Sequence, residues 1–132
     1  MNYMLDTHAF LWVLFDSDKL SKSVSSIIMN PENTVFVSLI SFWEISLKYH
    51  AGILSFRNIL PEELPKYAEK AGFEILHLTA AEVSTSYKLP KLKHKDPFDR
   101  LLIWQCLKNN ICLISKDSEL SVYKDYGLQI IW

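Results

Sequence analysis

Four short stretches of the chain place acidic residues where an apolar run gives way to a helical pattern; they are residues 5–8, 42–45, 94–100 and 115–117. In an open α/β sheet the carboxyl ends of the strands open onto one crevice, so acids that are far apart in sequence can meet there. Carboxylate oxygens are the ligands that hard divalent cations prefer. The acids of these stretches therefore predict a divalent-cation site.

Each of the aspartates also has a structural interpretation. Asp6 and Asp117 follow apolar runs and fit the N-cap of the next helix, where an Asp side chain accepts hydrogen bonds from free backbone N–H groups. Asp96 stands before Pro97, the arrangement of an N-cap followed by proline at the first helical position. Asp99 falls in the first turn of the same helix, where the helix dipole favours negative charge. Considered one at a time, each of these aspartates is explained by its place at the start of a helix.

The glutamate of the second stretch has structural alternatives too. Glu44 lies three residues after Ser41, the spacing of a capping box, and four before Lys48, the spacing of a helical ion pair. Its neighbours in sequence are mostly apolar, however, and Glu is almost never buried without a partner. Carboxylates brought together repel one another and raise each other's pKa unless a divalent cation holds them ionised. A shared cation accounts for all of these acids with one cause.

The donor types favour Mg²⁺ or Mn²⁺ over Zn²⁺, because oxygen ligands suit the first two and no His or Cys cluster has zinc-binding spacing. The scattered histidines and cysteines are His8, His50, His77, His94, Cys106 and Cys112. Mg²⁺ typically binds substrate phosphate through one or two protein carboxylates. The predicted chemistry is therefore that of phosphodiesters.

The elements that must position these acids alternate between strand and helix. Short apolar runs predict strands over residues 3–5, 34–37, 73–76, 111–114 and 128–131. Helical spacing predicts helices over residues 8–14, 21–29, 41–49, 61–70, 80–87 and 98–108. Such alternation favours a parallel sheet with helices on both faces. The tryptophans are predicted to pack in the core rather than to stack on bases; they are Trp12, Trp43, Trp104 and Trp132.

Composition sets limits on the class of protein. A chain of 132 residues, 49% of them apolar, fits one domain over residues 1–132 with a single core. The net charge of −1 argues against nucleic-acid binding through bulk electrostatics. Cys106 and Cys112 lie in apolar stretches and predict reduced core residues. The start has no basic segment and the apolar run 9–15 is too short to span a bilayer, so we expect a cytoplasmic protein.

Other residues near the acids are candidates for substrate contact, each with a structural alternative. Thr7 offers a hydroxyl beside a metal-bound phosphate, or it caps a helix. Arg100 offers a planar fork for phosphate, or it pairs with a neighbouring acid. The most basic loop, residues 88–95, either steers a phosphate-bearing substrate or is an ordinary solvated loop. Its lysines nearest the acids are Lys91, Lys93 and Lys95.

Taken in order, the four stretches resemble the motifs of the PIN-domain nucleases, and among them the VapC-type toxins of prokaryotic toxin–antitoxin pairs. The resemblance covers the whole chain. It rests on Leu-Asp-Thr-His-Ala-Phe-Leu-Trp (5–12), Ser-Phe-Trp-Glu-Ile (41–45), His-Lys-Asp-Pro-Phe-Asp-Arg-Leu-Leu-Ile (94–103) and Ser-Lys-Asp (115–117). The Asp-Pro-Phe-Asp-Arg element is the most distinctive of these motifs. The resemblance implies a three-layer α/β/α sandwich around a small, mainly parallel sheet.

The resemblance also implies residue roles and partners. The metal-site and catalytic acids would be Asp6, Glu44, Asp99 and Asp117, whereas Asp96 would cap the helix or support the site from behind. The implied reaction is Mg²⁺- or Mn²⁺-dependent hydrolysis of RNA phosphodiester bonds. VapC-type toxins act with a cognate antitoxin that blocks the acidic site, and they commonly form homodimers. We therefore expect RNA, an antitoxin and a second copy of the chain as partners.

Two other classes of protein share some of these sequence features. A catalytically silent PIN-like domain would act as an RNA- or protein-binding adaptor, but such proteins usually lack one or more acids, and none is missing here. A phosphoacceptor receiver domain also has a doubly wound sheet and an acidic pocket. That class expects adjacent acids after its first strand, whereas Asp6 is single and Glu44 lies within a predicted helix.

Overall fold

In the computed structural model, which describes residues 1–132, five short parallel strands form one sheet. They are β1 (Asn2–Leu5), β2 (Thr34–Ser38), β3 (Glu74–Leu76), β4 (Cys112–Ile114) and β5 (Ile130–Ile131). Their order is β3-β2-β1-β4-β5, so the chain builds outward from β1 on one side and then returns to build outward on the other. The point of reversal lies between β1 and β4. In such sheets a crevice opens beyond the carboxyl ends of the strands at this point.

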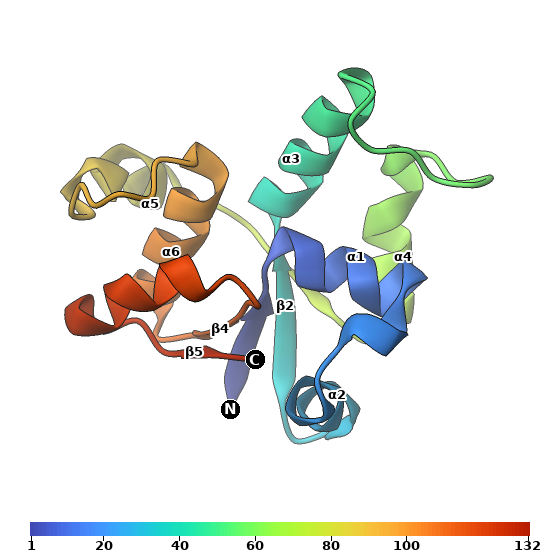
Figure 1. Cartoon of the computed structure of the whole chain (residues 1–132), viewed down its shortest axis with the longest axis horizontal. Helices are drawn as coiled ribbons and strands as arrows, with labels where there is room; N and C mark the ends of the chain where they lie inside the picture. Colours follow the sequence, from blue (N-terminus) through green and yellow to red (C-terminus); the bar gives the residue numbers. More distant parts are fainter.

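Helices cover both faces of the sheet, which confirms the predicted three-layer α/β/α architecture. Figure 1 shows α1 (Thr7–Phe15), α2 (Lys22–Met29) and α4 (Leu64–Lys70) on one side, with α5 (Ala80–Thr85) and α6 (Pro97–Asn109) on the other. Helix α3 (Leu39–His50) continues directly from the carboxyl end of β2. The 3₁₀ segments are Ser17–Lys19, Pro61–Glu63, Ser86–Lys88 and Ser118–Tyr126, the last labelled η4. No helix has the length and apolar character needed to cross a lipid bilayer.

The core consists of two apolar clusters, one on each face of the sheet. Successive residues of a strand point to opposite faces. Met4 and Leu113 accordingly join the cluster under α6, whereas Leu5 and Ile114 join the cluster under α1. Each cluster contains 11 buried residues, so neither face is left open, as a parallel sheet requires. Cys106 is fully within the first cluster.

Three strands begin one or two residues later than the sequence predicts, for one shared reason. Each follows a helical segment that ends in a residue with positive φ, namely Gly72, Asn110 or Gly127. The next residue donates its N–H back to the helix, as in a Schellman motif, and is therefore not available to the sheet. These bonds are Phe73 to Ala68 (3.0 Å), Ile111 to Cys106 (3.0 Å) and Leu128 to Tyr123 (3.2 Å).

Helix α3 begins two residues earlier than predicted, and this changes the position of Glu44. The Ser38 hydroxyl accepts a hydrogen bond from the Ile40 N–H (3.1 Å) and caps the helix. The alternative in which Ser41 and Glu44 form a capping box is therefore wrong. Both residues lie within the helix and both are buried. The Glu44 carboxylate is thus free of any capping role.

We expect Ser38→Ala to lower the free energy of unfolding by about 1–2 kcal/mol, because the Ile40 N–H would lose its partner in a buried position. Urea unfolding followed by circular dichroism measures this. The matched control is Ser46→Ala, an exposed position inside the same helix, where alanine favours the helix. Equal stability of the Ser38→Ala variant and the unsubstituted protein would contradict the capping role.

Candidate active site

Two of the predicted acids lie at the carboxyl ends of the two neighbouring strands that flank the reversal. Asp6 follows β1 and Asp117 follows β4, and the Asp6 N–H donates to the Ile114 carbonyl (3.0 Å). Both side chains cap the helix that follows, since Asp6 accepts from the Ala9 N–H (2.8 Å) and Asp117 from the Glu119 N–H (3.0 Å). They also line one open pocket, together with His8, Trp12 and Lys116. Capping and membership of a common site are therefore compatible.

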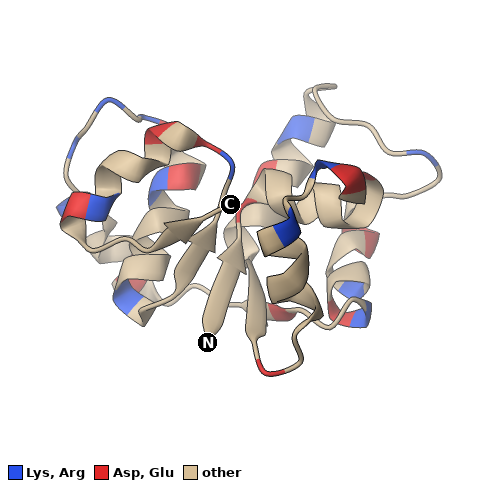
Figure 2. Cartoon of the chain, turned by 60° about the horizontal axis from the view of Figure 1, so that its bottom comes forward, with Lys and Arg blue, Asp and Glu red and all other residues tan.

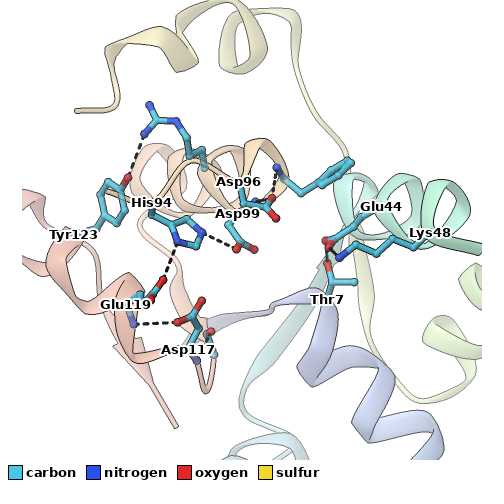
Figure 3. A network of polar contacts seen from close by, with 12 residues as sticks. Thr7, Glu44, Lys48, His94, Asp96, Asp99, Asp117, Glu119 and Tyr123 are labelled. Carbon is cyan, nitrogen blue, oxygen red and sulfur yellow. Dashed lines mark hydrogen bonds and ion pairs between the residues drawn. The ribbon is translucent and has the colours of Figure 1, made fainter. Parts of the chain in front are cut away.

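Glu44 reaches the same region from α3. It is 3% exposed, and its carboxylate accepts hydrogen bonds from the Thr7 hydroxyl (2.7 Å) and from the Lys48 ammonium. The Thr7 hydroxyl also lies 3.0 Å from the Ser41 hydroxyl, so α1 and α3 are joined by a buried polar contact. Figure 3 shows Thr7 and Lys48 converging on this carboxylate. The structure thus places the Thr7 side chain on Glu44 and not on a free N–H group.

The two aspartates at the start of α6 have different environments. The Asp96 carboxylate accepts from the N–H groups of Phe98 (2.8 Å) and Asp99 (3.1 Å), which makes it the N-cap of α6. Asp99 makes no capping bond. Its Oδ2 lies 2.7 Å from the Nε2 of His94. Asp96 is therefore committed to the backbone, whereas the Asp99 carboxylate faces the crevice (Figure 3).

The electrostatics link acids from three of the stretches. Burial raises the pKa of Asp6, hydrogen bonds from Ser115 and Ala9 offset part of this, and the charge of Glu44 raises it again. Burial also raises the pKa of Asp99 to about 6; the charges of Asp96 and Glu44 add to this rise, and His94 opposes it. Because Glu44 acts on both aspartates, the three carboxylates share one region. Figure 2 shows acidic positions from both halves of the chain beyond the ends of the strands.

A lysine offsets part of this negative charge, and a histidine contacts Asp99. Burial alone would lower the pKa of Lys48, but its ion pair with Glu44 and the charges of Asp96 and Asp99 raise it instead. His94 contacts Asp99 through Nε2, and its Nδ1 lies 3.7 Å from a carboxylate oxygen of Glu119. Each of these side chains lies between acids contributed by different parts of the chain.

The sequence alone does not single out His94 and Glu119 as site residues. One ligand atom each from His94, Asp117 and Glu119 lies within 4.8 Å of the other two. The sequence showed His94 only as one of four scattered histidines. Its contact with Asp99 spans five positions across a loop, which no helical or strand period predicts. The one available signal is its place two residues before Asp96, at the start of the 94–103 motif.

The basic residues around the site have separate roles. The Arg100 guanidinium donates to the carbonyls of Leu89 (2.9 Å) and Pro90 (3.1 Å) and to the Tyr123 hydroxyl (3.1 Å). It therefore holds the basic loop and η4 against α6, and it pairs with no acid. The lysines of the loop project from its surface and are exposed; they are Lys91, Lys93 and Lys95.

The prediction that every tryptophan packs in the core is wrong for Trp43, which is 57% exposed. The buried positions of α3 are Ile40, Ser41, Glu44 and Ile45, so position 43 lies on the outer face of the helix. Trp104 and Trp132 pack against the two core clusters, as predicted, while Trp12 lines the pocket beside Asp6 and Asp117.

The donor set fits a hard divalent cation. Asp6, Glu44, Asp99 and Asp117 supply only oxygen donors, and two of them have a pKa that burial has raised. A divalent cation bound among such groups favours their ionised forms and offsets the cost of burying their charge. Mg²⁺ and Mn²⁺ are the ions suited to carboxylate oxygens.

A family model described as PIN domain matches residues 3–126, and the chain therefore belongs to the PIN domain family. Two solved structures share its fold. The crystal structure of VapBC2 from Rickettsia felis bound to a DNA fragment from their promoter superposes with a TM-score of 0.70 at 16% identity, covering 99% of this chain and 98% of the other. The structure of VapBC-1 from nontypeable Haemophilus influenzae gives 0.65 at 16% identity, covering 99% and 97%. No curated protein sequence matches the chain.

The raised pKa of Asp99 gives an expectation for stability against pH. The folded protein binds this proton more tightly than the unfolded chain, so the resulting stabilisation is complete below the ordinary pKa of 3.8 and is lost as pH rises through about 6. We therefore expect Asp99→Asn to raise the unfolding temperature by several degrees at pH 7.5 in the presence of a chelator, and to change it little at pH 3.5. The rise of the Asp99 pKa from 3.8 to about 6 corresponds to about 3 kcal/mol of unfolding free energy at most.

Differential scanning calorimetry at the two pH values measures this, with the exposed Asp125→Asn as the matched control. A lower unfolding temperature for Asp99→Asn at pH 7.5 would show that the Asp99 charge stabilises the fold, contrary to this account.

Proposed function

We propose that this protein is a divalent-metal-dependent endoribonuclease that hydrolyses RNA phosphodiester bonds. The observation that carries the proposal is the convergence of acids at the reversal of the sheet: the charge of Glu44 acts on both Asp6 and Asp99, and Asp117 lines the same pocket as Asp6. Membership of the PIN domain family supports it. The retention of all four acids favours a nuclease over a catalytically silent adaptor.

The four carboxylates would hold Mg²⁺ or Mn²⁺. When bound, such a cation supplies Lewis acidity for the attack of water on the phosphodiester and neutralises charge on the phosphate. The chain's own groups fix the geometry. Thr7 holds one oxygen of Glu44, and the Asp96 cap fixes the first turn of α6, which carries Asp99. Lys48 limits the repulsion between Glu44 and the other acids.

RNA would approach across the basic loop. Since the net charge is −1, attraction for a polyanion has to be local, and the exposed lysines of residues 88–95 provide it. Arg100 contributes indirectly, because its hydrogen bonds to the Leu89 and Pro90 carbonyls keep the loop beside the acids. We propose that Lys91, Lys93 and Lys95 steer the substrate and that Arg100 positions the loop from which they project.

We further propose that the chain is the toxin of a toxin–antitoxin pair. The two solved structures of similar fold are named as VapBC assemblies, and one of them is bound to a promoter DNA fragment. By this analogy the chain would act as a single cytoplasmic domain over residues 1–132, form a homodimer, and be held inactive by a cognate antitoxin that covers the acidic crevice.

We expect the purified protein to cleave total RNA in Mg²⁺ or Mn²⁺, leaving 5′-phosphate ends. A chelator should abolish cleavage, and Asp6→Asn should reduce its rate by at least about 100-fold, since a group that holds the cation is lost. Denaturing gel electrophoresis with end labelling measures this. Asp125→Asn serves as the matched control, because that aspartate is exposed on η4 and lines no part of the pocket.

The start of α6 provides an internal comparison. Asp99→Asn should reduce the cleavage rate more than Asp96→Asn, because the Asp96 carboxylate is occupied by two backbone N–H groups. Cleavage that survives both the chelator and Asp6→Asn would exclude the proposed site. Binding of RNA without any cleavage would favour the adaptor.

A further inference from the structure

His94 contacts Asp99, one of the acids proposed to hold the cation. Its side chain is 11% exposed, and it extends from the basic loop into the space between the start of α6 and η4. Nε2 lies 2.7 Å from Oδ2 of Asp99, and Nδ1 lies 3.7 Å from an oxygen of Glu119 (Figure 3). The ionised form of Asp99, which is the form that would bind a cation, can only accept, so in that form Nε2 carries the proton of the bond.

The backbone around His94 is held at both ends. Arg100 binds the Leu89 and Pro90 carbonyls at the beginning of the loop, and Asp96 caps α6 at its end. These contacts allow a loop residue to hold a side chain in a fixed direction. They also come from α6 itself, the element that carries Asp99. The imidazole and the carboxylate are therefore positioned against the same helix.

Asp99 has no other hydrogen-bond partner for its side chain. With one oxygen bound to Nε2 of His94, the other oxygen is directed to a single side of the carboxylate. Without His94, nothing in the first turn of α6 would fix the rotation of this group. Carboxylates that bind metals are commonly held by such hydrogen bonds from neighbouring groups.

We propose that His94 is a positioning residue, which holds the Asp99 carboxylate in the orientation that binds the divalent cation. The proposal rests on the proposed function of the acidic site and adds to it a residue that binds neither cation nor RNA. It assigns the effect to the Nε2 nitrogen alone. Nδ1 faces Glu119 at a distance too long for a hydrogen bond and is not required.

Two substitutions separate the nitrogens. The amide of a glutamine places a donor near the position of Nε2, whereas the amide of an asparagine reaches only the position of Nδ1. We expect His94→Ala to weaken Mn²⁺ binding by roughly 10–100-fold, the usual effect of losing such a partner. His94→Gln should restore most of the affinity, and His94→Asn should not. His77→Ala, an exposed histidine whose side chain makes no polar contact, is the matched control.

Mn²⁺ affinity is measured by isothermal titration calorimetry and by the loss of the free-ion electron paramagnetic resonance signal, neither of which depends on cleavage. Equal affinity of the His94→Ala variant and the unsubstituted protein overturns the proposal, and so does equal rescue by Asn and Gln. A nitrogen hyperfine coupling to Mn²⁺ that disappears in His94→Ala also overturns it, because His94 would then be a ligand. If His94→Ala does not fold, the Mn²⁺ affinities of His94→Gln and His94→Asn are compared. A higher affinity of His94→Gln supports the proposal, and equal affinities overturn it.

The outcomes for the two proposals are distinct. Strong Mn²⁺ binding that depends on position 94, in a protein that cleaves no RNA, supports the role of His94 and contradicts the proposed function. RNA cleavage by a protein whose Mn²⁺ affinity is unchanged by substitution of His94 supports the proposed function and contradicts the role of His94.

Discussion

The cost of withdrawing neighbouring carboxylates from water is the constraint on which the arrangement of this protein depends. Asp6 and Asp99 have pKa values raised by burial, and both are raised further by the charge of Glu44. A fold built only for stability would not bring these groups together, because each charge moved out of water costs free energy. The reversal of strand order between β1 and β4 nevertheless places them at one edge of the sheet. A divalent cation held among these carboxylates would offset this cost.

The site is supported by ordinary structural devices that serve two purposes. Asp6 and Asp117 cap the elements that follow their strands and line the same pocket. Asp96 caps α6 and thereby fixes the first turn that presents Asp99. Structural and chemical interpretations of an acidic residue at a strand–helix junction are therefore not exclusive, because the geometry of the cap directs the carboxylate toward the crevice.

The sequence predicts the layers of the fold because its apolar periods are local. Alternating strands and helices lead to a parallel sheet covered on both faces, and the structure has this architecture. The predicted first residues of three strands are less accurate. The first residue of each of these apolar runs donates its N–H to the preceding helical segment and is not available to the sheet. The exposure of Trp43 depends on which face of α3 packs against the rest of the fold, and the buried face carries Ile40, Ser41, Glu44 and Ile45. A difference of two residues at the start of α3 was enough to misplace the capping role of Ser41.

The contacts of the site are harder to predict from sequence, because they join residues without a common period. His94 meets Asp99 across a loop, and Thr7 meets Glu44 over 37 positions. The direction of a side chain depends on packing among distant elements, so the type of an acid predicts its chemistry but not its partner.

The most direct test of the central claim is the anomalous diffraction of crystals soaked in Mn²⁺. We predict an anomalous peak coordinated by oxygens of Asp6, Glu44 and Asp99, with Asp117 at the same centre. Mn²⁺ peaks elsewhere on the molecule, with none among these carboxylates, would contradict this prediction.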